Sequence, residues 1–265
     1  MHYITIRNGE ERQWVVLIHG LSGSSRQNQH QVEAYRRHFN LINLDLPGHG
    51  ASPPLKKYSF EVLNREILAI LDREGVGKAH FMALSLGTAI LVGLVGAHPE
   101  RVKSIVWAGA ILGFSEEHLQ LIYTNLRGGE RKTEEELIRN ITQIMEPTLF
   151  CGRSTGYEKE LEKMGPREPL KWLGLMLRLR QVYPDFVRNS EGIPMLFISG
   201  ERDVAYIDRV RTFCREQGKE LHIIPQGRHP CNLFYPEAFN RISLDFLLRQ
   251  VNSAPRDQGK RARPV

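Results

Sequence analysis

The chain has 265 residues, a formal net charge of +6, a hydrophobic fraction of 41% and a charged fraction of 25%. These values are ordinary for a globular protein and exclude a fibre or a largely disordered chain. Much of the excess positive charge lies in residues 253–265, SAPRDQGKRARPV, which have no apolar period. We expect this segment to be a disordered basic tail. Nucleic-acid binding through it is a remote alternative, so we expect no nucleic-acid partner.

The three cysteines and the amino-terminal residues predict a cytoplasmic location. Cys151, Cys214 and Cys231 form no CxxC pair and show no framework spacing, as is usual for reduced thiols. The first residues, MHYITIRNGEER, contain no apolar region of the kind found in signal peptides. The apolar run Phe81–Ala97 is slightly short for a membrane span and contains three glycines, so a buried strand, turn and helix explain it better. We therefore expect no membrane association.

Strand and helix patterns alternate along most of the chain. A short edge hairpin is expected first, in which the segment Tyr3–Arg7 leads through Asn8-Gly9 into the strand Trp14–Ile18. The further strands expected are Leu41–Leu44, His80–Leu84, Val102–Trp107, Met195–Ser199 and Leu221–Ile224, and the helices are Ser59–Glu74, Leu86–Ala97, Tyr206–Gln217 and Pro236–Val251. This alternation predicts an α/β fold with a mostly parallel sheet flanked by helices.

One long region interrupts the alternation. Residues 112–189 contain no convincing strand but several helix signals, including the capping box of Thr133 and Glu136 and the apolar stretch Pro169–Val182. We interpret residues 112–189 as a helical lid inserted between sheet strands. Residues 1–111 and 190–252 then form the core domain.

Ser85 stands between an expected strand and an expected helix. A sharp turn at such a junction lifts a serine hydroxyl above the sheet and is known as a nucleophile elbow. The residues two positions before and after the serine must be small, and Gly87 meets this requirement. Ala83 occupies the position where the common pattern G-x-S-x-G has glycine, which lowers the specificity of the motif.

A second loop, beginning with His19 and Gly20, follows the expected strand Trp14–Ile18. A loop that leaves a strand end can offer a backbone N–H to a developing oxyanion. The expected pair of donors is the N–H of Leu21 and the N–H of Leu86, which opens the helix after the elbow. Taken alone, His19 could also simply fill the end of the strand.

Two further strand ends carry an acid and a histidine. Asp203 follows the expected strand Met195–Ser199, and His229 follows Leu221–Ile224. Each residue alone is unremarkable in a loop. The carboxyl ends of parallel strands share one edge of a sheet, however, where open α/β sheets place their sites. Ser85, Asp203 and His229 therefore form a candidate catalytic triad of nucleophile, acid and base.

These residues together resemble the α/β-hydrolase superfamily, of the small esterase, lactonase and C–C hydrolase type. The matching segments are His19-Gly20, Asp45–Ser52, the elbow around Ser85, Gly200–Asp203 and Gly227–His229, and the resemblance extends from Trp14 to about Val251. It implies the chain order serine, acid, histidine, which this sequence has. It also implies the fold expected above, while the lid carries no pattern that indicates one substrate.

The expected function is that of a serine hydrolase acting on small to medium apolar esters or lactones through an acyl-enzyme on Ser85. The alternatives are C–C bond, thioester or amide hydrolysis or a lyase-type synthase reaction on the same triad, and a non-catalytic small-molecule receptor or signalling module. Asp45 as a substitute acid and Cys231 as a nucleophile are weaker candidates, and His49 is expected to be structural. No metal-ligand spacing and no cofactor motif is present, so the expected partner is a small ester-like molecule.

Overall fold

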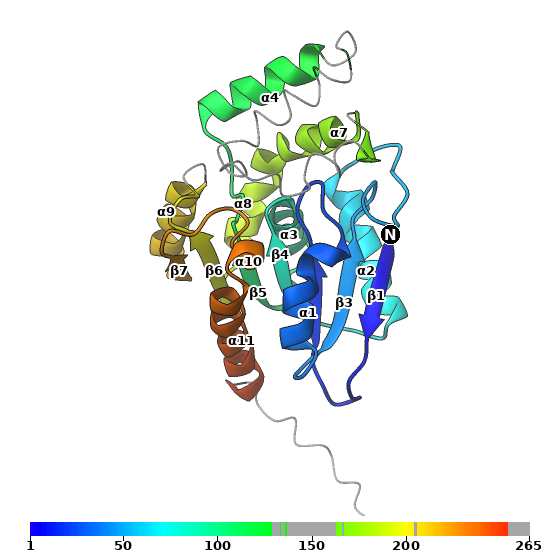
Figure 1. Cartoon of the computed structure of the whole chain (residues 1–265), viewed down its shortest axis with the longest axis vertical. Coiled ribbons are helices and arrows are strands. Elements are labelled where there is room, and N and C mark those ends of the chain that lie inside the picture. Colours follow the sequence, from blue (N-terminus) through cyan, green and yellow to red (C-terminus); the bar gives the residue numbers. More distant parts are fainter. Residues whose placement is uncertain (129–132, 134–135, 137–162, 166, 204–205, 254–265) are drawn as a thin grey trace, which may run out of the picture.

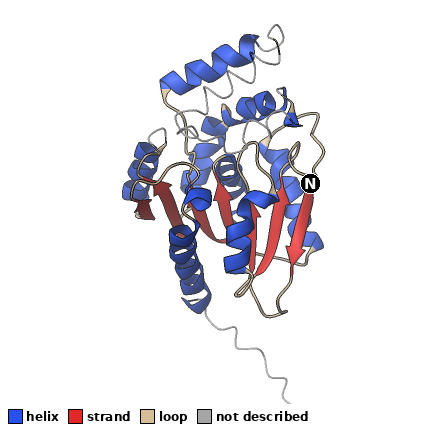
Figure 2. Cartoon of the chain, viewed as in Figure 1, coloured by secondary structure: helices blue, strands red, loops and turns tan. Residues whose placement is uncertain are grey.

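The computed structural model describes residues 1–128, 133, 136, 163–165, 167–203 and 206–253. Seven strands form one sheet in the order β1-β3-β2-β4-β5-β6-β7 (Figures 1 and 2). Their bounds are β1 His2–Ile6, β2 Trp14–Ile18, β3 Asn40–Asp45, β4 Ala79–Leu84, β5 Val102–Ala108, β6 Met195–Gly200 and β7 Glu220–Ile224. All neighbours from β3 to β7 pair in parallel, so the expected fold class is confirmed.

The amino-terminal strand is at the edge of the sheet, but the expected hairpin is wrong. β1 pairs antiparallel with β3, with Tyr3 opposite Leu44, and does not pair with β2. Asn8 and Gly9 are followed by a chain that passes β3 to reach β2, because β3 lies between β1 and β2 in the sheet. The side chain of Asn40 holds this crossing, because its amide donates to the carbonyls of Gly9 and Arg12 at 2.8 and 3.0 Å.

Alternate residues of the central strands enter two separate cores, one on each face of the sheet. Val15 and Leu17 of β2 face the core that α1 (Gln29–Tyr35) and α11 (Pro236–Ser253) cover. Val16 and Ile18 face the opposite core. The helices over that second core are α2 (Phe60–Arg73), α3 (Leu86–Ala97), α8 (Leu179–Asn189) and α9 (Ile207–Gln217). The short elements η1 (Ser25–Asn28), η2 (Pro99–Arg101) and α10 (Cys231–Phe234) complete the described core.

Two described helices of the interrupting region lie beyond the carboxyl ends of the parallel strands (Figure 1). They are α4 (Glu116–Gly128) and α7 (Arg167–Met176). The expected capping box is confirmed, because the N–H of Thr133 donates to Glu136 Oε2 at 2.8 Å and the N–H of Glu136 donates to Thr133 Oγ1 at 3.3 Å. Most residues that follow this box, and the tail from residue 254, lie outside the described residues.

The apolar stretch Pro169–Val182 belongs to two helices, because α7 ends at Met176 and α8 begins at Leu179. Most large apolar residues of α7 are buried, with Trp172 and Leu173 both at 0% exposure. α8 packs beside α3. The two helices are close at Gly96, where a Cβ would lie 3.2 Å from the backbone nitrogen of Phe186. No helix of the described residues is long and apolar enough to cross a membrane.

Candidate active site

Ser85 occupies a sharp turn between β4 and α3. Its backbone has φ 48° and ψ −114°, a conformation that residues other than glycine rarely adopt and that costs on the order of 1–3 kcal/mol. The surrounding hydrogen bonds hold this geometry. The N–H of Ser85 donates to the carbonyl of Ala108 at the end of β5 at 3.0 Å, and the N–H of Thr88 donates to the carbonyl of Ser85 at 2.8 Å. The predicted elbow is therefore present as a strained, fixed turn.

The small residue after the elbow is required by close packing. A Cβ on Gly87 would lie 2.8 Å from the carbonyl oxygen of His19 and 2.8 Å from Cγ2 of Ile18. Glycine thus allows α3 to begin directly against the end of β2. Gly20 lies on the same side, and a Cβ built on it would be 3.4 Å from Cβ of Ser85. The loop after β2 therefore borders the serine, as the sequence predicts.

His229 and Asp203 form a buried hydrogen-bonded pair. Nδ1 of His229 is 2.9 Å from Oδ2 of Asp203, and the side chains are 1% and 2% exposed. A carboxylate that accepts from Nδ1–H leaves the lone pair on Nε2, which is the tautomer a general base needs. The loops carrying the two residues are joined by backbone, because the N–H of Arg202 donates to the carbonyl of Gly227 at 2.8 Å.

Gly109 brings the serine and the histidine to one place, and sequence reasoning missed it. Its φ is +55°, and a Cβ on it would lie 2.5 Å from Nδ1 of His229 and 3.4 Å from Oδ2 of Asp203. The imidazole therefore packs against the backbone directly after Ala108, the residue whose carbonyl binds the N–H of Ser85. Ser85 and His229 thus both border the end of β5. A glycine two residues after the expected strand Val102–Trp107 was the signal that could have indicated this site.

Two backbone N–H groups are available near the serine for an oxyanion. Within the described residues, the N–H of Leu21 donates no hydrogen bond. Leu86 is the first residue of α3, where a helical N–H has no acceptor inside the helix. Both residues are buried, at 5% and 1% exposure. They are the donors expected from the sequence, and their role in binding an oxyanion remains a prediction.

Two buried histidines bind the loop after β2 to the loop after β3. Nε2 of His19 accepts from the N–H of Leu46 at 2.9 Å, and its Nδ1 lies 2.7 Å from the carbonyl of Gly20. Nε2 of His49 accepts from the N–H of Ser22 at 3.1 Å. His19 therefore does more than fill the strand end, and His49 has the structural place expected for it.

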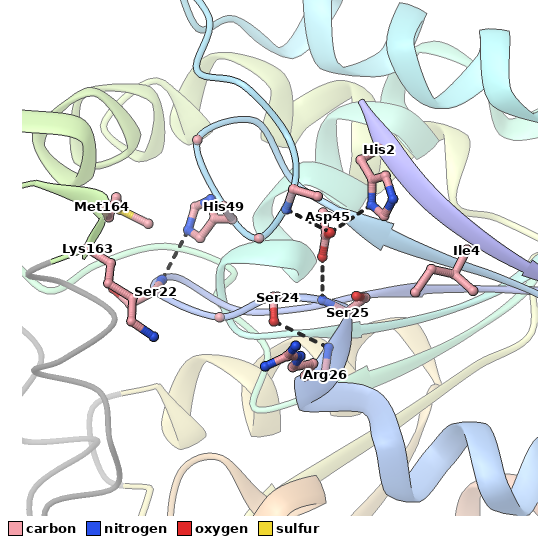
Figure 3. A pocket seen from close by; sticks show the side chains of 14 residues that line it. His2, Ile4, Ser22, Ser24, Ser25, Arg26, Asp45, His49, Lys163 and Met164 are labelled. Atoms are coloured by element: carbon pink, nitrogen blue, oxygen red, sulfur yellow. Dashed lines mark hydrogen bonds and ion pairs between the residues drawn. The ribbon is translucent and has the colours of Figure 1, made fainter.

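The remaining candidates have other partners. Asp45 accepts from the N–H groups of Ser25 at 2.7 Å and Ala51 at 3.0 Å and from Nδ1 of His2 at 2.8 Å, so it joins two loops and the edge strand (Figure 3). These residues border a pocket of about 520 Å³. Cys231 is buried, and burial raises the pKa of its thiol to about 12, which opposes a thiolate nucleophile.

Known proteins share the fold of this chain. The structure of MenH from S. aureus matches with a TM-score of 0.79 at 16% identity, covering 95% of this chain and 99% of that one. The family model of the alpha/beta hydrolase fold matches residues 13–135. The chain has the α/β-hydrolase fold. The family match includes Ser85, while Asp203 and His229 lie beyond it.

Curated relatives match over nearly the whole chain. A 2-succinyl-6-hydroxy-2,4-cyclohexadiene-1-carboxylate synthase from Enterobacter sp. (strain 638) is 23% identical, with 91% of this chain and 94% of the relative covered. A 2-hydroxy-6-oxononadienedioate/2-hydroxy-6-oxononatrienedioate hydrolase from Burkholderia vietnamiensis is 26% identical, with 94% and 91% covered. The relatives thus have different activities, so similarity alone does not assign one to this chain.

Three buried histidines should make the protein less stable in acid. Burial lowers the pKa of His19 and His80 to about 4 and, together with the nearby His19, lowers that of His49 to about 3, from 6.5. Below pH 6.5 the unfolded chain therefore binds protons that the folded chain does not bind. The free energy of unfolding should fall as the pH decreases from 7 toward 4, with a slope approaching about 1.4 kcal/mol per pH unit for each histidine.

Urea unfolding between pH 7.5 and 5 measures this slope. His80 is the best residue to replace, because its partners are Ser104 and Gln13, away from the serine. His80→Gln should reduce the slope of the free energy of unfolding with pH by the contribution of one histidine, whatever the substitution does to stability at pH 7.5. His38→Gln, at an exposed position, should leave the slope unchanged. An unaltered slope in His80→Gln would contradict the prediction.

Proposed function

We propose that the chain is a serine hydrolase that cleaves carboxylic esters or lactones through an acyl-enzyme on Ser85. The observation that carries the proposal is the buried His229–Asp203 pair packed against Gly109, beside the backbone that binds the N–H of Ser85. A serine hydroxyl becomes a useful nucleophile only when a base accepts its proton. The tautomer that Asp203 selects leaves Nε2 of His229 able to do so.

The reaction then follows in two steps. Oγ of Ser85 bonds to the carbonyl carbon, its proton passes to His229, and the negative oxygen is stabilised by the N–H groups of Leu21 and Leu86. His229 gives the proton to the departing alcohol. Water, deprotonated by His229, next attacks the acyl-enzyme, and the acid leaves as Ser85 regains its proton. Neither step uses a cofactor or a metal ion.

A pocket of about 630 Å³ between α4, α8 and α9 is the proposed place of the acyl or alcohol group. Its lining combines apolar residues such as Leu112 and Phe114 with charged ones such as Arg209, and it includes none of the three triad residues. Aromatic rings connect this pocket to the base, because Phe114 contacts Tyr206 at 6.2 Å between centroids and Tyr206 contacts His229 at 6.1 Å. A small to medium acyl or alcohol group is the proposed occupant, and the proposed partner is a small ester-like molecule. The buried free thiols of Cys214 and Cys231 support a cytoplasmic location.

The test combines an ester panel with covalent labelling. We expect turnover of p-nitrophenyl esters from C2 to C12, with a maximum at short to medium chains, and of simple lactones. A fluorophosphonate should label the chain once, at Ser85, because this reagent reports an activated serine whatever the natural substrate is. A folded chain that neither turns over any ester nor accepts the label would overturn the proposal and favour a receptor or signalling role.

A second candidate function has its own observation. Two relatives that match over more than nine-tenths of the chain are named as a synthase and as a hydrolase of an oxononadienedioate or oxononatrienedioate. A chain that accepts the fluorophosphonate but hydrolyses no ester or lactone would favour such a specialised reaction on the same three residues. The label thus tests the serine, and the panel tests the class of bond.

A further inference from the structure

A line of buried rings connects helix α7 to the loop that borders Ser85. Trp172 of α7 is fully buried and meets His49 edge-on, with 5.6 Å between the ring centroids. His49 in turn lies 5.0 Å from His19. A helix outside the sheet is therefore in contact with the residue that accepts a hydrogen bond from the backbone of Ser22.

The hydrogen bonds of His49 fix which of its nitrogens carries the proton. Nδ1 lies 3.1 Å from the carbonyl of Pro47, which can only accept, so Nδ1 is the donor. Nε2 therefore holds a lone pair and accepts from the N–H of Ser22 at 3.1 Å (Figure 3). The ring is 3% exposed, so water does not readily replace it as the partner of this N–H.

The acceptor matters because of the backbone that it holds. Ser22 has φ 56°, a left-handed conformation that is unfavourable for serine. Its N–H belongs to the peptide group that directly follows Leu21, so a rotation of this group alters the backbone angles of Leu21. The N–H of Leu21, which would bind the oxyanion, is one residue away from the bond to His49.

We propose that His49, which packs against Trp172 of α7, is a positioning residue that orients the N–H of Leu21 toward the reacting oxygen. The inference rests on the proposed function, because it assumes an oxyanion at that place. His49 touches neither the serine nor the substrate in this account. It acts through the peptide group between Leu21 and Ser22.

The other end of the connection is also fixed. Glu168, at the start of α7, is buried and accepts hydrogen bonds from the hydroxyl of Tyr58 and, at 2.8 Å, from Nζ of Lys171. The ring of Tyr58 contacts Trp172 with 4.6 Å between centroids. Tyr58 belongs to the segment that follows the loop of His49. One packed cluster therefore contains Glu168 and Trp172 of α7 together with Tyr58 and His49.

The test replaces the acceptor while keeping a ring. His49→Phe should lower kcat for a p-nitrophenyl ester roughly 10- to 100-fold with little change in KM, because a misplaced oxyanion donor costs energy mainly in the transition state. His49→Gln, whose Oε1 can accept the N–H of Ser22 in place of Nε2, should restore most of kcat. If the phenylalanine variant does not fold, His49→Asn serves instead, since its shorter side chain does not reach Ser22.

A matched control separates positioning from stability. His80 is also buried, is held by Ser104 and Gln13, and lies in β4 away from the loop of Leu21. His80→Phe should lower the melting temperature and leave kcat of the folded protein unchanged. Equal kcat in wild type and His49→Phe, or an equal loss in the phenylalanine and glutamine variants, would overturn the inference.

Labelling keeps this result distinct from the fate of the proposed function. In the reaction with a fluorophosphonate, Oγ of Ser85 bonds to phosphorus and fluoride leaves, while the phosphoryl oxygen occupies the oxyanion position. His49→Phe should slow this labelling by a similar factor, even if no ester in the panel is a substrate. Wild type that labels at the same rate as His49→Phe would overturn the role of His49 and leave the nucleophile in place.

Discussion

Ser85→Ala should lower kcat about 10⁴- to 10⁶-fold and leave the fold intact. The loss is large because no other hydroxyl replaces the nucleophile at the elbow. The fold should survive because the Ser85 side chain makes no capping hydrogen bond to α3, and the turn is held by its backbone bonds to Ala108 and Thr88. Steady-state hydrolysis of the best ester, followed with circular dichroism of both proteins, measures the two parts of the prediction.

A buried serine elsewhere on the sheet provides the control. Ser199, in β6, is 2% exposed, and Ser199→Ala should retain turnover within a few-fold of wild type. Near-normal turnover by Ser85→Ala would refute the assignment of the nucleophile. An equal loss in both variants would mean that the defect lies in folding and not in the chemistry.

Asp203→Asn should lower kcat roughly 10³- to 10⁴-fold while the free energy of unfolding changes far less. The amide can present an N–H to Nδ1 of His229, which then becomes the acceptor and places the proton on Nε2, the wrong tautomer for a base. Within the described residues, no second carboxylate is bonded to His229 that could take over. Single-turnover acylation with a p-nitrophenyl ester is the measurement, because it isolates the step in which the base acts.

An exposed acid on another helix is the matched comparison. The side chain of Asp72 on α2 is 66% exposed and pairs with Arg101, so Asp72→Asn should leave acylation unchanged. If Asp203→Asn acylated as fast as wild type, the pair with His229 would be a structural contact. Asp45 could not have replaced Asp203 in that case, because its hydrogen bonds come from Ser25, Ala51 and His2 and not from His229.

The sequence predicts the parallel part of the fold well, because each strand carries its own local signal. Buried β-branched runs end at turn residues, and the strand–turn–helix junction at Ser85 needs only neighbouring residues to be recognised. Asp203 and His229 could be placed for the same reason. Parallel strands finish at one edge, so knowing that each residue follows a strand is enough to predict that it lies at the same edge of the sheet as the serine.

Features set by distant contacts could not be predicted in this way. The turn residues Asn8 and Gly9 indicate a hairpin, but the pairing of β1 with β3 depends on which strand end is free. The role of Gly109 depends on the ring of His229, which lies 120 residues further along the chain. The short helix α1 (Gln29–Tyr35) has buried Gln31 and Tyr35, whose partners Asn240 and Ser243 belong to α11. Nothing in the local pattern reveals such partners.

The register in which β5 pairs with β6 does not depend on the length of the chain segment between them. The chain leaves the sheet at Ala108 and returns at Met195, yet Ile105 lies opposite Met195 and Ala108 opposite Ile198 in an ordinary parallel register. The entropy lost in closing a loop grows only with the logarithm of its length, so doubling the intervening segment costs about 0.6 kcal/mol. That segment can therefore change in length without moving Ser85, Asp203 or His229, so the residues proposed to react and those proposed to select the substrate can vary separately.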